Sequence, residues 1–195
     1  MNARSPFVVA FVCVANVFAV TPAVTHAQAD TAQARQLFAE INKKLPQLER
    51  VTFNSKRPGV DYKAEGKAWV DVGAIKKVEI TERDDGGDVV SEFYYSGGTL
   101  VFVYEAVKGF ADSGNSKKQI TTNEERYYFR DGKLFKWVSG MGNDKGGNAP
   151  DSPEFADTAK SRLAASAIFQ AAAQKALSAK SASKIYRGRF PRSSR

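Results

Sequence analysis

The stretch ERYYFRDGKLFKWV, residues 125–138, sets three aromatic residues before an Asp-Gly pair and a Phe and a Trp after it. Strand-forming residues on both sides of Asp131-Gly132 predict a β-hairpin, because Asp-Gly readily adopts the mirror-image turns that join antiparallel strands. Two further stretches, WVDVGAIKKV (69–78) and YYSGGTLVFV (94–103), align without gaps with YFRDGKLFKW (128–137). The sequence therefore predicts three hairpins of one design.

A glycine stands at an equivalent turn position of each hairpin, at residues 73, 98 and 132. This position requires a positive φ, which glycine adopts without steric cost. The pairs Gly97-Gly98 and Asp131-Gly132 suit a two-residue mirror-image turn. Val72-Gly73 does not, because a β-branched residue resists positive φ. We therefore expect the first hairpin to use a different type of turn.

Residues that oppose each other across a hairpin point to the same face of the sheet. With Phe129 opposite Leu134, counting outward from the turn sets Tyr128 opposite Phe135. One face is then purely apolar, and we expect a helix to cover it as the core. This core face collects Val70, Ile75, Phe93, Tyr95, Leu100, Phe102, Tyr104, Phe129 and Leu134.

The other face mixes aromatic rings with charged side chains. Tyr and Trp combine a large contact area with a polar group, so this mixed aromatic face is the candidate surface for binding a partner. The alternative is that a second helix packs on it and makes it a second core. The candidate partner-binding residues are Trp69, Tyr94, Arg126, Tyr128, Phe135 and Trp137.

Helical patterns flank the hairpins. A short amphipathic helix begins at a candidate N-cap, Asp30, and ends before Pro46. An Ala-rich helix begins at Ser152-Pro153-Glu154 and is expected to run to about Lys180. The apolar stripes are Leu37, Phe38, Ile41 and Leu45 in the first helix, and Phe155, Ala159, Leu163, Phe169, Ala173 and Leu177 in the second.

This order of elements predicts a single α+β domain over residues 30–180. We expect an antiparallel β-meander of about six strands, built from the three glycine-turn hairpins, at about residues 51–139. A linker at 140–152 and the helix at 153–180 follow. The N-terminal helix and the Ala-rich C-terminal helix pack the sheet.

The first 29 residues have the layout of a secretory signal peptide. Arg4 precedes an apolar run at residues 7–20, and small residues follow Pro22. The run is shorter than the roughly 20 apolar residues that cross a bilayer. We expect cleavage after Ala27 or after Ala29, which places the mature chain in the periplasm or outside the cell, without a transmembrane segment.

Cleavage would remove the single cysteine, Cys13, and the single histidine, His26. A chain that lacks both cannot hold a Ser-His-Asp or Cys-His pair, a zinc site built on those residues, or a disulfide. We therefore expect no cofactor and assign no catalytic residue.

Acidic residues offer no better candidate for catalysis or metal binding. The glycine-rich loops at 83–88 and 142–148 lack the spacing of a calcium-binding loop, so we predict no metal site. Asp84-Asp85 and Glu124-Glu125 are neighbours in sequence, and on strands the two members of each pair point to opposite faces. Glycosidases need carboxyl groups that face a common bond.

The formal net charge of +8 is concentrated in the C-terminal tail. Seven basic residues and no acidic residue follow Gln174, and these seven with Arg4 account for the whole excess. We expect a disordered tail at 181–195 that makes weak contact with an anionic surface, and no nucleic-acid partner. The alternative is a solvated tail that only aids solubility. The candidate anionic-surface residues are Arg187, Arg189 and Arg192.

The segments EERYYFRDGKLFKW (124–137) and EFYYSGGTLVFVYE (92–105) resemble a group of exported bacterial proteins of uncharacterised function. Proteins of that group carry repeated Tyr-Tyr-Phe-x-x-Gly-Lys-Leu hairpins. The resemblance covers about residues 65–138 and implies the hairpin meander. It transfers no catalytic residue, and both helices and the tail lie outside it.

These features predict an exported, non-enzymatic binding or inhibitor-like module that uses the mixed aromatic face, with an envelope protein or a glycan as its partner. Two alternatives stay open. One is a carboxylate-dependent hydrolase of the cell envelope, which needs only two acidic residues. The other is a structural envelope protein.

Overall fold

The computed structural model describes residues 26–56, 64–84, 87–113, 116–140 and 152–189. Seven strands form one antiparallel sheet in which each strand lies beside the next along the chain. The predicted α+β meander is confirmed, with one strand more than expected, because a strand precedes the first hairpin. The strands are β1 (Glu49–Ser55), β2 (Ala64–Asp71), β3 (Ala74–Asp84), β4 (Gly87–Ser96), β5 (Thr99–Ser113), β6 (Ser116–Arg130) and β7 (Lys133–Ser139).

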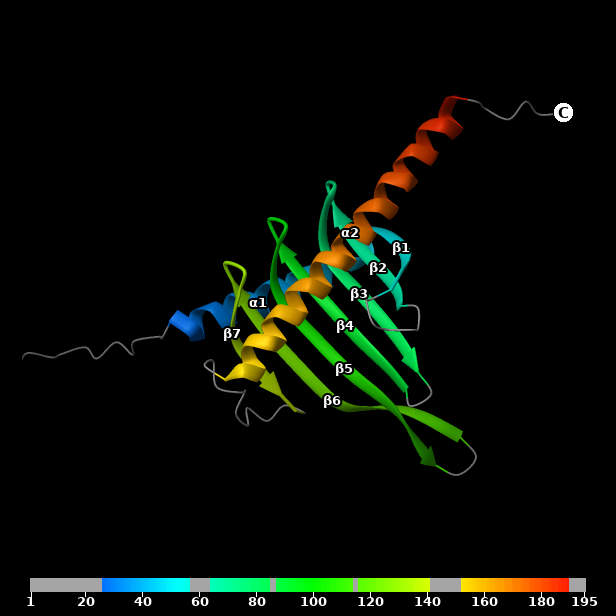
Figure 1. Ribbon diagram of the computed structural model, residues 1–195. Helices are drawn as coiled ribbons and strands as arrows, with labels where there is room; N and C mark the ends of the chain where they lie inside the picture. The colour runs from blue at the N-terminus through cyan, green and yellow to red at the C-terminus, as the bar shows by residue number, and fades with distance from the viewer. Residues whose placement is uncertain (1–25, 57–63, 85–86, 114–115, 141–151, 190–195) are drawn as a thin grey trace, which may run out of the picture.

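Two helices cover opposite faces of the sheet (Figure 1). The first, α1 (His26–Lys44), continues into the short 3₁₀ helix η1 (Leu45–Gln47), and the second, α2 (Pro153–Arg189), crosses the strands diagonally. Asp30 therefore lies inside α1 and is not its N-cap. The residues before Asp30 are mainly Ala and Gln, which are compatible with a helix.

The α2 helix also continues beyond its predicted end. Residues 181–187 contain neither Gly nor Pro, so no local signal stops the helix before Gly188 and Pro191. The expected disorder after Lys180 is therefore wrong for residues 181–189. Figure 1 shows these last turns projecting past the sheet. Residues 190–195 lie outside the described part of the chain.

The three predicted hairpins are β2–β3, β4–β5 and β6–β7, and all three use the same two-residue turn. Both central residues have positive φ in each: 47° and 79° at Val72-Gly73, 56° and 81° at Gly97-Gly98, and 50° and 73° at Asp131-Gly132. The different turn expected for the first hairpin is therefore wrong. Val72 adopts the left-handed region with a fully exposed side chain, which leaves it without compensating packing.

Each hairpin also carries a β-bulge at the same aligned position. The second strand has one extra residue just after the turn, which is Lys76, Val101 or Phe135. A bulge of this kind shifts the pairing by one residue, and every side chain beyond it changes face. The observed partners are Trp69 with Lys77, Tyr94 with Phe102, and Tyr128 with Lys136.

Because of the bulges, three residues lie on the opposite face from the one predicted. Phe102 and Tyr104, expected in the core, lie on the α1 side. Trp137, expected on the mixed aromatic face, lies on the α2 side, where its ring stacks on Tyr127 with 5.7 Å between the ring centroids. The other seven residues of the predicted core face do pack under α2.

The α2 side holds the main apolar core. All six residues of the predicted apolar stripe of α2 pack against the sheet. Phe169 contacts Phe93 with 5.6 Å between the ring centroids, and the hydroxyls of Tyr95 and Ser166 share a hydrogen bond of 3.0 Å. Both Phe169 and Tyr95 are buried, so α2 excludes water from this part of the sheet.

An ion pair ties α2 to the middle of the sheet. Arg162 Nη1 lies 2.7 Å from Glu105 Oε2, and Arg162 Nη2 donates to the Tyr127 hydroxyl at 3.1 Å. Ser91 Oγ donates to the same Glu105 oxygen at 2.9 Å. Burial raises the pKa of Tyr127 to about 12, so its hydroxyl stays neutral. This half-buried pair fixes where α2 crosses β5 and β6.

The strained turn of the first hairpin generates a stability prediction. We expect V72N to raise the free energy of unfolding by about 1 kcal/mol, because Asn tolerates positive φ where Val does not. Urea unfolding followed by circular dichroism measures the change. D131N is the matched control at the equivalent turn position and should shift stability by less than about 0.5 kcal/mol. Equal effects of the two substitutions would contradict the prediction.

The ion pair of α2 generates a second stability prediction. E105Q leaves the Arg162 guanidinium half-buried without its counter-charge, and we expect a loss of about 3 kcal/mol of unfolding free energy. The control is E49Q, which removes the exposed partner of Lys180 and should cost at most about 1 kcal/mol. Urea unfolding of both variants would refute the prediction if they lost the same stability.

Candidate functional site

The α1 helix covers only part of its face of the sheet. Ala34 and Ile41 point at the strands and are buried. At about 100° per residue, Arg35 and Phe38 lie on one flank of the helix, and Gln33 lies on the other. A hollow runs along each flank. The α1 helix therefore leaves a groove open along each of its flanks.

The first hollow, called here the aromatic groove, has a volume of about 500 Å³ and lies between α1 and strands β5, β6 and β7. The Phe102 and Tyr128 rings form its floor, with 5.0 Å between their centroids. Phe38 overhangs Phe102 edge-on at 5.8 Å and is 36 % exposed. The lining residues are Arg35, Phe38, Phe102, Tyr104, Arg126, Tyr128 and Val138.

Strand register creates this floor. Tyr94, Phe102 and Tyr128 are direct cross-strand partners on β4, β5 and β6, so their side chains form one row. In the next row, Tyr104 pairs with Arg126. Neighbours within a row stand about 5 Å apart, which suits ring-to-ring contact. The floor is therefore fixed by backbone pairing.

Polar contacts set the chemistry of the groove. The Tyr104 hydroxyl donates to Glu124 Oε1 at 2.8 Å, and Arg126 forms an ion pair with the same carboxylate. Burial first, and then the Glu124 carboxylate, raise the pKa of Tyr104 to about 12. At neutral pH Tyr104 is therefore a protonated hydrogen-bond donor that is already satisfied, and not a general base.

A buried polar network holds α1 beside the groove. The Lys77 ammonium donates to Glu92 Oε1 at 2.8 Å and lies 5.2 Å and 5.1 Å from the Trp69 and Tyr94 ring centroids. The Tyr94 hydroxyl donates to Glu92 Oε2 at 2.5 Å and accepts from Asn42 Nδ2 at 3.0 Å. Burial, reinforced by Glu92, raises the pKa of Tyr94. Because Asn42 belongs to α1, the network fixes the helix on the sheet.

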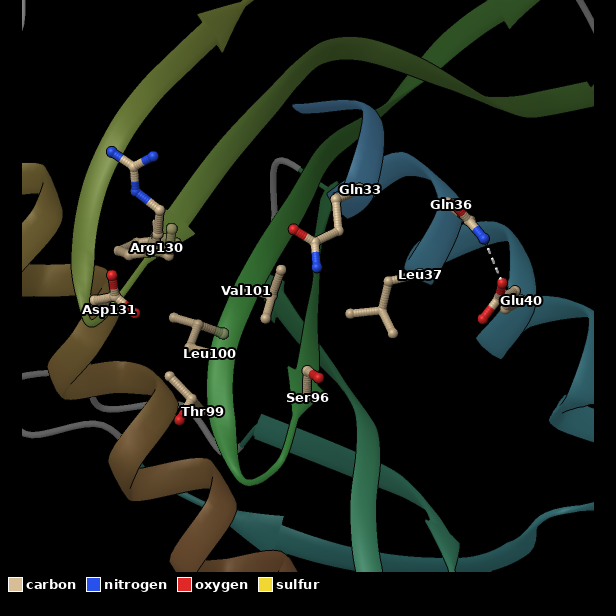
Figure 2. Close-up of a pocket in the computed structure, with 11 residues that line it drawn as sticks. Gln33, Gln36, Leu37, Glu40, Ser96, Thr99, Leu100, Val101, Arg130 and Asp131 are labelled. Carbon is tan, nitrogen blue, oxygen red and sulfur yellow. Dashed lines mark hydrogen bonds between the residues drawn. The ribbon is translucent and has the colours of Figure 1, made fainter. Parts of the chain in front are cut away.

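The second hollow, called here the turn-side groove, has a volume of about 530 Å³ on the other flank of α1. Figure 2 shows polar side chains from α1 and from the β4–β5 and β6–β7 turns around it. Gln36 Nε2 donates to Glu40 Oε1 at 2.9 Å. The lining residues are Gln33, Gln36, Leu37, Glu40, Ser96, Thr99, Leu100, Val101, Phe129, Arg130 and Asp131.

The structure separates the six residues predicted to bind a partner. Arg126 and Tyr128 line the aromatic groove. Tyr94 lies beneath Phe38, is fully buried and offers no surface to a partner. The Phe135 ring packs beside the Tyr128 ring, with 6.3 Å between the ring centroids.

The two tryptophans lie away from the groove. Trp69 is buried against Lys77, toward the β2 side of the sheet. Trp137 lies on the opposite face, where its indole nitrogen donates to Glu125. Glu124 faces α1 and Glu125 faces α2, so the prediction that this carboxylate pair points to opposite faces is confirmed.

Five residues of the groove were not among the predicted site residues. Phe102 and Tyr104 were assigned to the wrong face because strand alternation does not reveal a bulge. Phe38 was recognised only as part of the apolar stripe. The spacing of Arg35 and Phe38, three residues apart on a helix, could have placed them on one flank. Val138, at the end of β7, gave no signal.

The other predicted sites are placed only in part. Arg187 and Arg189 lie on the last turns of α2, with side chains that are not described, and Arg192 and the loop at 142–148 fall outside the described residues. Within the described ranges, no three His, Cys, Asp or Glu side chains gather as metal ligands would. The helices described here also include none that is both long and apolar enough to cross a membrane.

Comparisons with known proteins place the chain in no family. No protein-family model matches it, and searches of curated proteins and of solved structures returned no significant match.

Proposed function

We propose that the protein is an exported, non-enzymatic binding protein whose site is the aromatic groove, and that it takes a small ligand with a flat apolar body. The observation that carries this proposal is the hollow between α1 and β5–β7, where the side chains of Phe38 and Tyr104 stay partly exposed beside the buried rings of Phe102 and Tyr128. A volume of about 500 Å³ lies in the range of small-molecule sites.

The groove is preformed. Its floor rings belong to central strands and are almost fully buried, while Phe38 on the rim stays partly exposed. Rings that are already fixed lose little conformational entropy when a flat ligand stacks on them. This arrangement favours a small ligand over the broad contact with an envelope protein that the sequence pattern suggested, because α1 lies across the middle of that face.

The carboxylates support binding over hydrolysis. Each of the two carboxylates beside the groove accepts hydrogen bonds from a cation and from a tyrosine. Each carboxylate is therefore already occupied by partners within the protein, whereas the two carboxyl groups of a glycosidase must face the bond that is cleaved. The pairs are Glu92 with Lys77 and Tyr94, and Glu124 with Arg126 and Tyr104.

Export rests on the signal-like N-terminal segment. Cleavage after Ala27 or Ala29 would shorten α1 by only its first two or four residues. Arg35 and Phe38 would keep their places, because α1 is held by Ala34, Ile41 and Asn42. Processing and an intact groove are therefore compatible.

The processing step generates a direct prediction. Protein recovered from the periplasm or the medium of an expressing bacterium should begin at Gln28 or Asp30, because small residues precede both positions. Intact-mass spectrometry of the purified protein identifies the terminus. Finding Met1 on the recovered protein would refute export by cleavage, and replacing Ala27 and Ala29 with bulky residues should block processing.

The binding site generates a prediction for Phe38. Naphthamide, a neutral flat probe, should shift the NMR resonances of Phe102, Tyr128 and Val138, and F38A should weaken its binding by about fivefold because one aromatic contact is lost. The matched control is I120A, which truncates another exposed apolar side chain that lies outside the groove. Resonance shifts elsewhere, or equal affinities of the two variants, would overturn the proposed site.

A further inference from the structure

Three ion pairs stand on the α1 side of the sheet, whereas Lys136, the partner of Tyr128 on β7, forms no ion pair within the described residues. Glu79 pairs with Lys67 at 2.7 Å, and Glu92 pairs with Lys77 at 2.8 Å. Both pairs stand in the cross-strand rows that lead to the aromatic groove. At the groove itself, Arg126 is paired with Glu124. None of these pairs leaves a net charge for a ligand to neutralise.

Arg35 differs from these paired charges. It lines the groove from α1, on the rim that faces the sheet residues. Within the part of the chain that the structure describes, it makes no ion pair with an acidic side chain. Its guanidinium is exposed and offers five donors in a planar fork that matches a carboxylate. The aromatic groove therefore carries a net charge of about +1 at its rim.

The groove thus combines an apolar floor with one uncompensated cation. A ligand whose apolar body packed against Phe38 and Tyr104 and that carried an anionic group at its edge would meet both features at once. A charge-assisted, bidentate hydrogen bond to a guanidinium also orients the ligand, which ring stacking alone does not do.

We propose that the ligand of the aromatic groove is an amphipathic organic anion, a flat apolar body with a carboxylate at one end, and that Arg35 binds the carboxylate. This inference rests on the proposed function and adds the class of ligand. Arg126 has a different role: its charge is offset by Glu124, and it positions the Tyr104 side of the groove.

The turn-side groove offers a contrast that supports the choice of site. Its charged side chains are Glu40, Asp131 and Arg130, so acidic groups outnumber basic ones there. Gln36 already donates to Glu40. An anion would therefore be repelled from this flank of α1 and attracted to the other, although the two hollows are similar in size.

The test compares naphthoate with naphthamide, two probes of the same shape that differ in charge. Titration calorimetry of the purified full chain at neutral pH should give about tenfold tighter binding of naphthoate, since a charge-assisted hydrogen bond contributes this much. R35Q should abolish the preference, so that this variant binds naphthoate and naphthamide with affinities that agree within about twofold. Added salt should weaken only the naphthoate complex.

R130Q is the matched control, because it removes the same charge from an exposed arginine on the other flank of α1. It should leave the preference for naphthoate intact. Equal binding of the two probes to the unsubstituted protein, or a preference that survives in R35Q, would overturn the role of Arg35 while leaving the groove as a site. Failure of both probes to bind would overturn the groove and this inference together.

Discussion

One extra residue after each glycine turn decides which side chains meet on the two faces of the sheet. Without the bulges, Phe102 and Tyr104 would join the α2 core, and Trp137 would lie on the α1 side. With them, Tyr94, Phe102 and Tyr128 form one row under α1. Because all three hairpins carry the bulge at the same position, the rows stay continuous across the sheet. The floor of the candidate site is thus a product of backbone pairing.

The two faces of the sheet are packed in different ways. On the α2 side, apolar packing along a long helix and one half-buried ion pair hold the helix on the sheet. On the α1 side, a shorter helix rests on a smaller apolar cluster and a buried polar network. Lys77 and Tyr94 both donate hydrogen bonds to Glu92, and Asn42 links this network to the helix. Such a network specifies one position for α1 at the cost of desolvating charges. Because α1 covers only part of its face of the sheet, a groove stays open along each of its flanks.

The chemistry of the groove follows from pairing within the protein. The carboxylates beside it accept hydrogen bonds from neighbouring cations and tyrosines, and burial raises the pKa of Tyr94 and Tyr104. At neutral pH these tyrosines stay protonated and already donate to a carboxylate within the protein. The groove offers a ligand apolar contact area and the Arg35 guanidinium on its rim, which has no acidic partner among the described residues. That combination selects ligands by shape and charge together.

Turn chemistry and periodicity are local, so the three glycine-turn hairpins, the antiparallel meander and the apolar stripe of α2 could be predicted from the residues alone. The face that each ring occupies and the place where α1 crosses the strands follow from long-range packing. A bulge shifts the alternation by one residue, and because both faces of this sheet carry apolar rings, the residue pattern does not reveal the shift. Likewise, Arg35 and Phe38 come to line the same groove as Tyr128 only through the packing of α1, which the spacing within the helix does not reveal. The positions of the hairpins could be read from residues 69–137, whereas the groove depends on contacts between segments more than 60 residues apart.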